Sequence, residues 1–284
     1  RMPSGTQLER TEAAAQQLLA LVKRDTGGDG VQLSLGLVGV HAPNYPVNLI
    51  HLWNGGPEEG YLQFQLRPGI AADAALREKL RASLAREMPD LRVSFEPSDI
   101  ISRVMSFGAN TPIEVAVSGP SLPASKAFAE KLLERLRTVP ALRDIHLAQS
   151  LDAPTVDVTV DRERAGLSGV KMNDVTRSLV AATASSRFTV PNYWADPNSG
   201  VAFSVQVQIP TAKTTSLDDL GNIPVGGREG RPLLLRNVAA LTPGTAVGQF
   251  ERYNMARVVT VTANLEGSDL GRVAQEVEAA VRSV

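Results

Sequence analysis

Three valines alternate with polar residues over positions 154–160, at 156, 158 and 160. This period of two predicts a half-buried β-strand. The alternation stops at Asp161, whose carboxylate can cap a short helical turn over residues 162–167. A second helix is predicted beyond Gly169, because apolar residues then recur on one helical face. The segment thus predicts a strand, a turn and a helix, with polar caps and an apolar core face.

The hydrophobic pattern before position 100 predicts five elements. The spacing of Thr6 and Glu9 is that of a capping box and predicts a helix to about Arg24. Further along the chain, the pattern predicts strands at 31–37, 62–66 and 91–95 and a helix at 73–87. The strand at 62–66 is preceded by a long segment, 39–59, in which proline and glycine are frequent. The order is αββαβ, with one strand absent at the front.

The second half repeats this pattern. Its predicted elements are a strand at 113–117, a helix opened by Ser121 and Pro123, a strand at 145–147, a strand at 258–263 and a helix at 268–281. A strand at 201–209, a short strand at 233–235 and a glycine-marked hairpin at 226–230 belong to the intervening segment. Two split βαβ units, one lacking its first strand and the other its last, predict an α+β fragment that would be ferredoxin-like if intact.

Four motifs in this order resemble the RND (resistance–nodulation–division) family of efflux transporters. They read RMPSGTQLERTEAAAQQLL, RVMSFGANTPIEVAVSGPSL, PTVDVTVDRERAGLSGVKMNDVTRSLVAA and FERYNMARVVTVTANLEGSDLGRVAQEV. The resemblance implies the second large periplasmic loop of such a pump, cut from between membrane helices of an inner-membrane protein. It also implies a porter subdomain at 1–104, a second, discontinuous porter subdomain at 105–151 and 249–284, and a mixed α/β docking subdomain at 152–248.

Composition narrows the functional classes. With 29 basic and 30 acidic residues the net charge is −1, so the composition lacks the excess of basic residues that is typical of nucleic-acid-binding proteins. The absence of cysteine excludes disulfides, thiolate metal sites and cysteine nucleophiles. No run approaches the roughly 20 apolar residues that span a bilayer, and no signal peptide is visible. Hydrolase, zinc-protease and phosphate-loop motifs are also absent, which predicts a protein that is not an enzyme and needs no cofactor.

The segment 39–59 is the strongest candidate for substrate binding. Its Tyr45, Leu49 and Trp53 are costly to leave in solvent, and a long irregular segment is often functional. Its place resembles the porter loop between the drug-binding pockets of multidrug pumps, although it is longer here. The alternative is that these side chains only fill the core of their own subdomain. His146 ends a strand near the place where a basic residue lines the pocket in multidrug relatives. A lone histidine is more often a surface or satisfied core residue than a ligand, and that remains the favoured interpretation of His146.

Two methionines favour an alternative substrate. Met2 and Met105 resemble two of the three thioether ligands in copper and silver exporters of the family, since soft ligands select Cu(I). The third ligand position falls near Glu59, where the sequence has no methionine. Methionine also commonly fills gaps in hydrophobic cores. Core packing is therefore the favoured interpretation of both residues.

Tyr193 and Trp194 are candidates for docking a partner, because exposed aromatic residues at a loop tip suit a protein contact. Ordinary packing is the competing interpretation.

The function that the resemblance implies is proton-driven efflux of amphiphilic or hydrophobic compounds toward an outer-membrane channel. The implied partners are small amphiphilic substrates, a periplasmic adaptor and the channel, with a homotrimer as the assembled pump. The alternatives are a heavy-metal exporter of the copper and silver type and a stand-alone periplasmic solute-binding protein.

Overall fold

The computed structural model describes residues 1–40, 54–96, 109–210, 214, 216–228, 231–267 and 269–284. They form two compact units. Unit 1 comprises Arg1–Ala153 and Ala246–Val284, and unit 2 comprises Pro154–Thr245. The mixture of helices and antiparallel sheets confirms the predicted α+β class. Division of the chain into three subdomains stays a prediction.

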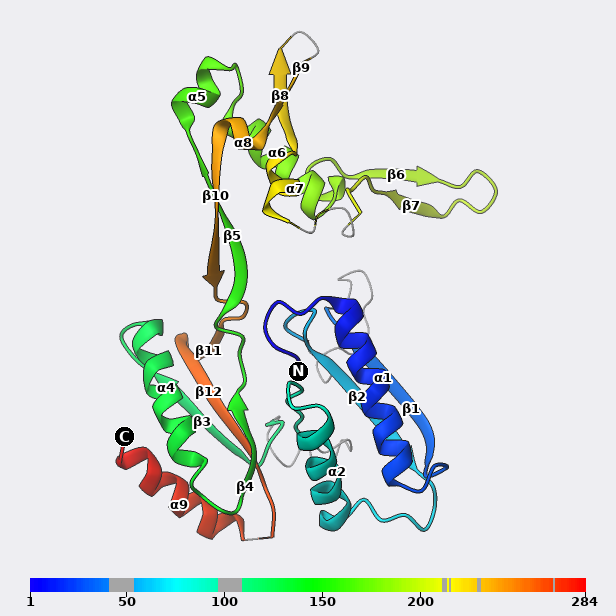
Figure 1. Ribbon diagram of the computed structural model, residues 1–284, viewed down its shortest axis with the longest axis vertical. Coiled ribbons are helices and arrows are strands. Elements are labelled where there is room, and N and C mark those ends of the chain that lie inside the picture. The colour runs from blue at the N-terminus through cyan, green and yellow to red at the C-terminus, as the bar shows by residue number, and fades with distance from the viewer. Residues whose placement is uncertain (41–53, 97–108, 211–213, 215, 229–230, 268) are drawn as a thin grey trace. The chain divides into compact units, whose positions relative to one another are not determined.

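Residues 1–40 and 54–96 form what we call the first lobe of unit 1. Its elements are α1 (Leu8–Asp25), β1 (Val31–Val38), β2 (Gly60–Leu66) and α2 (Ala74–Glu87). β1 and β2 pair antiparallel beside the two helices (Figure 1). Both helices contribute to a core of Leu21, Val22, Leu80 and Leu84. The carboxylate of Asp73 accepts a hydrogen bond from the Leu76 amide and so caps α2.

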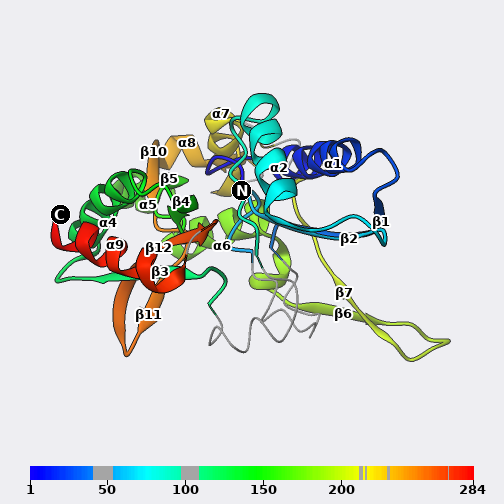
Figure 2. The ribbon, with the colours of Figure 1, turned by 90° about the horizontal axis from the view of Figure 1, so that it is seen from below.

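Residues 109–153 and 246–284 form the second lobe. Its elements are β3 (Ile113–Ser118), α4 (Leu122–Leu136), β4 (Leu142–Leu147), β11 (Glu251–Tyr253), β12 (Ala256–Leu265) and α9 (Leu270–Arg282). β12 is central and pairs antiparallel with β3, β4 and β11. Figure 2 shows α4 and α9 side by side on one face of this sheet. Among the described residues β3 has no strand partner other than β12.

The two faces of β12 differ in chemistry. Val259, Val261 and Ala263 are fully buried and belong to the core under α4 and α9. The alternate positions, Thr260, Thr262 and Asn264, are also buried, although they are polar. Successive side chains of a strand point to opposite faces. The sheet therefore has an apolar face under its helices and a buried polar face on the other side.

Unit 2 begins and ends with two long strands, β5 (Ala153–Val160) and β10 (Ala239–Ala246), which pair with each other (Figure 1). Between them lie α5 (Arg162–Leu167), α6 (Met172–Thr183), η2 (Ser186–Phe188), β6 (Asn192–Ala195), β7 (Ala202–Val205), α7 (Leu217–Gly221), β8 (Pro224–Arg228), β9 (Arg231–Leu234) and α8 (Leu235–Val238). The strand, turn and helix predicted from 154 onward are confirmed, as is the hairpin near Gly226, which joins β8 to β9.

Asp161 caps α5 as predicted, with Oδ1 accepting a hydrogen bond from the Arg164 amide at 2.9 Å. Asp161→Ala should lower the unfolding free energy of unit 2 by about 0.5–2 kcal/mol, because an amide at the helix start loses its acceptor. Urea denaturation monitored by circular dichroism measures the loss. Glu163→Ala, in the same turn, is the matched control and should cost less. Equal losses in the two variants would show that the cap is not the cause.

Three predicted elements are wrong in detail. Residues 91–96 form no strand; Leu91, Val93 and Phe95 pack on the first-lobe core without a ladder, because alternation reports one-sided burial and not pairing. Thr6 is not a cap, since its hydroxyl donates to the Pro3 carbonyl and the helix starts at Leu8. The strand at 201–209 is reduced to β7, because its partner β6 is only four residues long.

Candidate functional site

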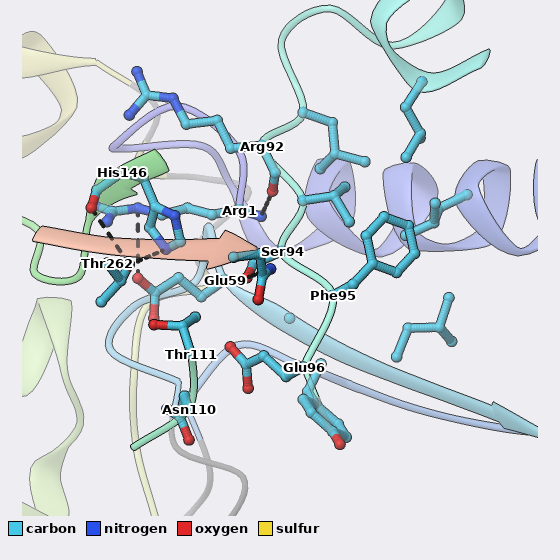
Figure 3. A pocket seen from close by; sticks show the side chains of 18 of the residues that line it. Arg1, Glu59, Arg92, Ser94, Phe95, Glu96, Asn110, Thr111, His146 and Thr262 are labelled. Atoms are coloured by element: carbon cyan, nitrogen blue, oxygen red, sulfur yellow. Dashed lines mark hydrogen bonds and ion pairs between the residues drawn. The ribbon is translucent and has the colours of Figure 1, made fainter. Parts of the chain in front are cut away.

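A cavity of about 960 Å³ lies in unit 1 and is lined by both lobes (Figure 3); we call it the cleft. The first lobe contributes mainly apolar side chains, among them Leu18, Val22, Phe64, Leu80, Val93 and Phe95. The second lobe contributes mainly polar ones, among them His146, Gln249, Glu251, Thr260, Thr262 and Asn264. The polar face of β12 therefore forms one wall of the cleft.

A bulge in β4 shapes this wall. His146 pairs with Thr262 and Arg143 pairs with Asn264, so Asp144 and Ile145 together oppose the single residue Ala263. Asp144 has φ +53°, a left-handed conformation that aspartate tolerates better than most residues. Bulges redirect side chains, and they occur often beside functional sites.

His146 is fixed by two contacts. Its Nδ1 lies 2.7 Å from the Asp144 carbonyl oxygen. Its Nε2 lies 3.3 Å from the Thr262 hydroxyl, a contact drawn in Figure 3. Burial lowers the pKa of His146, so the ring is neutral near pH 7. Because a carbonyl can only accept, Nδ1 carries the proton and Nε2 accepts from Thr262. The histidine is thus a neutral hydrogen-bonding group of the wall.

Two arginines that line the cleft are paired with carboxylates of the second lobe. Arg81 binds Asp144 through two hydrogen bonds of 2.9 and 2.7 Å. Arg77 binds Glu266 through two of 3.1 Å, and these bonds lower the pKa of Glu266. This pairing neutralises the two arginines. The cleft offers one apolar surface and one hydrogen-bonding surface to the same bound molecule.

In the described part of the chain, no three His, Cys, Asp or Glu side chains lie close enough together to hold a metal ion. Glu59 lines the cleft, but its carboxylate forms an ion pair with Arg1 at 3.5 Å and accepts from the Gly55 amide at 2.5 Å. Met2 is half-buried and does not line the cleft; its backbone amide donates to the Glu58 carbonyl.

Of the candidates for substrate binding, the structure places His146 in the cleft wall. Tyr45, Leu49 and Trp53 lie outside the described residues, as does Met105. Their roles stay predictions.

The docking candidates lie on the hairpin of β6 and β7 in unit 2 (Figure 1). Tyr193 is 71% exposed and Trp194 is 54% exposed. The Trp194 ring lies 6.1 Å from the ring of Phe203 on the neighbouring strand. Val201, Val205 and Val207 are exposed on the same segment. The hairpin therefore presents an apolar surface to its surroundings.

Sequence reasoning missed the residues that join the lobes, Arg81, Asp144, Asn264 and Glu266. One signal was present: Thr260, Thr262 and Asn264 alternate with apolar residues in a strand whose other face packs on helices. A second face made of small hydrogen-bonding side chains indicates contact with another polar surface. The partner, Arg81, carries no such signal, since it resembles any arginine of a solvent-facing helix.

Comparisons with known proteins assign the family. The AcrB/AcrD/AcrF family matches residues 2–284. The chain is 26% identical over 181 residues to the cobalt-zinc-cadmium resistance protein CzcA of Cupriavidus metallidurans, covering 62% of this chain and 17% of that protein. It is 24% identical over 223 residues to the cation efflux system protein CusA of Escherichia coli, covering 77% and 20%. The chain thus spans about a fifth of the length of these relatives.

The fold is that of a solved transporter. A crystal structure of a heavy metal efflux pump superposes with a TM-score of 0.80 at 21% identity, covering 99% of this chain and 28% of the pump. Within the described residues, no helix is both long and apolar enough to cross a membrane. The family match over nearly the whole chain and the shared fold agree with the four sequence motifs, and the chain belongs to the AcrB/AcrD/AcrF family of RND transporters.

Proposed function

We propose that this chain is the periplasmic part of a proton-driven RND exporter and that its cleft receives amphiphilic compounds. The observation that carries this proposal is the pairing of an apolar wall from the first lobe with a polar wall from β4 and β12 in one cavity of about 960 Å³. Apolar walls hold varied molecules without strict hydrogen-bond geometry, while a few polar groups orient them. Full-length pumps of this type would pass such molecules toward an outer-membrane channel.

A metal-exporting pump is the second candidate, because CzcA and CusA are named for resistance to cations or for their efflux. Two carboxylates of the cleft argue against it, since Glu59 already accepts from the Gly55 amide and Glu266 already binds Arg77. A cation would have to displace those partners.

The exposed hairpin of β6 and β7 is the proposed contact with a periplasmic adaptor or the outer-membrane channel in a trimeric pump. Its support is the run of exposed apolar side chains around Tyr193 and Trp194. Aromatic residues are enriched at the centres of protein interfaces.

Filling the cleft tests the proposal. In the purified full-length transporter, Thr262→Trp should weaken the binding of a lipophilic cationic dye by tenfold or more, because an indole occupies the space beside His146 and tenfold corresponds to about 1.4 kcal/mol. Dye fluorescence polarisation measures the affinity.

Thr176→Trp, at an exposed position of α6, is the control and should bind dye as the parent does. Equal affinities of the two variants would refute the cleft as the dye site. Tight binding of Zn²⁺ or Cu⁺ by a parent protein that does not bind dye would favour the metal exporter.

A further inference from the structure

We propose that Arg81 is the clamp that holds the two lobes of unit 1 together and keeps the cleft closed. In this proposal the cleft opens when the Arg81 guanidinium releases Asp144 and Glu266. The inference rests on the proposed function in one respect, namely that the cleft is where substrate enters.

The two lobes have separate hydrophobic cores. The first-lobe core is built on α1 and α2, and the second-lobe core is built on α4, α9 and the apolar face of β12; they share no residue. Several of the contacts between the lobes are hydrogen bonds and ion pairs, such as Asn264 Nδ2 to Ser94 Oγ at 3.0 Å. Polar groups can exchange such partners for water, whereas exposing a shared apolar core would carry the full hydrophobic cost. The lobes can therefore separate without unfolding.

Arg81 is at the centre of these contacts. It extends from α2 of the first lobe and reaches two elements of the second, Asp144 in the β4 bulge and Glu266 just beyond β12. The pair with Asp144 is bidentate, and the guanidinium also lies 4.9 Å from the centre of the Phe95 ring. The side chains of Arg81, Asp144 and Glu266 are only 14%, 7% and 11% exposed. Solvent therefore screens this cluster little.

Removal of Arg81 would take a shared cation away from two largely buried carboxylates, Asp144 and Glu266. Asp144 would retain the Asn264 amide, and Glu266 would retain Arg77. Buried carboxylates that lose a cation repel each other and gain by hydration. Separation of the lobes supplies that water, so loss of the guanidinium favours the open cleft.

The neighbouring Arg143–Glu78 bridge makes a weaker contribution, because its side chains are 34% and 43% exposed. Exposed pairs contribute little to stability because water competes for both partners. The Arg77–Glu266 pair also joins the lobes, with Arg77 37% and Glu266 11% exposed. The residues of the β4 bulge also connect the clamp to the wall of the cleft, since the Asp144 carbonyl holds the His146 ring.

Distance measurements between the lobes test the clamp. Exposed Ala20 in α1 and Ala127 in α4 are replaced by cysteine for spin labels, in the full-length transporter with any cysteines outside this chain replaced. Labelled protein is diluted with unlabelled protein and measured by double electron–electron resonance without substrate. Arg81→Gln should shift the distance distribution to longer values. Arg81→Lys should shift it less, because lysine keeps the positive charge but cannot form the two parallel hydrogen bonds of a guanidinium.

Arg24→Gln is the matched control. Arg24 binds Glu87 through two hydrogen bonds of 2.8 and 3.0 Å, but both residues belong to the first lobe. This variant should keep the parental distances. The proposal is overturned if folded Arg81→Gln keeps them too, or if Arg24→Gln shifts them equally.

Should Arg81→Gln fail to fold, Asp144→Asn breaks the same pair from the other lobe with an isosteric side chain and must give the same shift. Dye binding is measured separately. A shifted distance in a protein that does not bind dye would keep the clamp and reject the proposed substrate class.

Discussion

Leu132→Ala is expected to lower the unfolding free energy of unit 1 by about 2–5 kcal/mol, the range for leucine truncation in a packed core. Leu132 is fully buried on α4, where it belongs to the same core as Val259 and Val261 of β12. Truncation removes apolar contacts from both the helix and the central strand, and the sheet cannot collapse onto the space without breaking its register. Chemical denaturation measures the loss.

Its control is Lys131→Ala, at the exposed neighbouring position of the same helix, which should change stability by well under 1 kcal/mol. Hydrogen exchange locates the effect. Faster exchange should appear in β3, β4, β12, α4 and α9. A loss no larger than that of Lys131→Ala would show that this core is not close-packed.

Leu235→Ala should have a comparable effect, about 2–5 kcal/mol, but confined to unit 2. Leu235 is fully buried on α8 and belongs to a core with Ala165, Val175, Val225 and Val238. That core shares no residue with the cores of unit 1. Faster hydrogen exchange is therefore expected within residues 154–245 alone, because a loss of stability in one core has little effect on a core that shares no contacts with it.

Arg236→Ala, the exposed next residue of α8, serves as its control. If Leu235→Ala also accelerated exchange in β3 or α4, the two units would unfold as one, contrary to this prediction.

The sequence predicted most elements because their patterns report local forces. The run from Pro154 to Thr183 has a clear period of two, a cap and a helical stripe, and the structure reproduces each of them. Residues 91–95 have an equally clear alternation but form no strand, since pairing depends on a neighbour that the pattern cannot identify. Alternation therefore predicted burial correctly and pairing wrongly.

The candidate site was less predictable. His146 could be chosen by residue type, but its role as a neutral acceptor depends on the β4 bulge and on Thr262, which lies far away in the sequence. The pairing of Arg81 with Asp144 joins two lobes across 63 positions, and it leaves no periodic pattern in the sequence from which it could be predicted. Tertiary ion pairs of this kind are fixed by the docking of finished lobes and not by local sequence.

The discontinuous sheet of the second lobe has a consequence for the order of folding. β12 must reach β3 and β4 although all of unit 2 separates them in the chain. Loop closure becomes costlier as the loop lengthens, and distant pairings form slowly. The paired strands β5 and β10 bring together the two places where the chain passes between the units. The Gly248 amide also donates a hydrogen bond of 2.9 Å to the Ser150 carbonyl beside them. Early folding of unit 2 would thus turn a long-range search into the closure of a short loop, and refolding of the β12 sheet should slow whenever unit 2 is delayed.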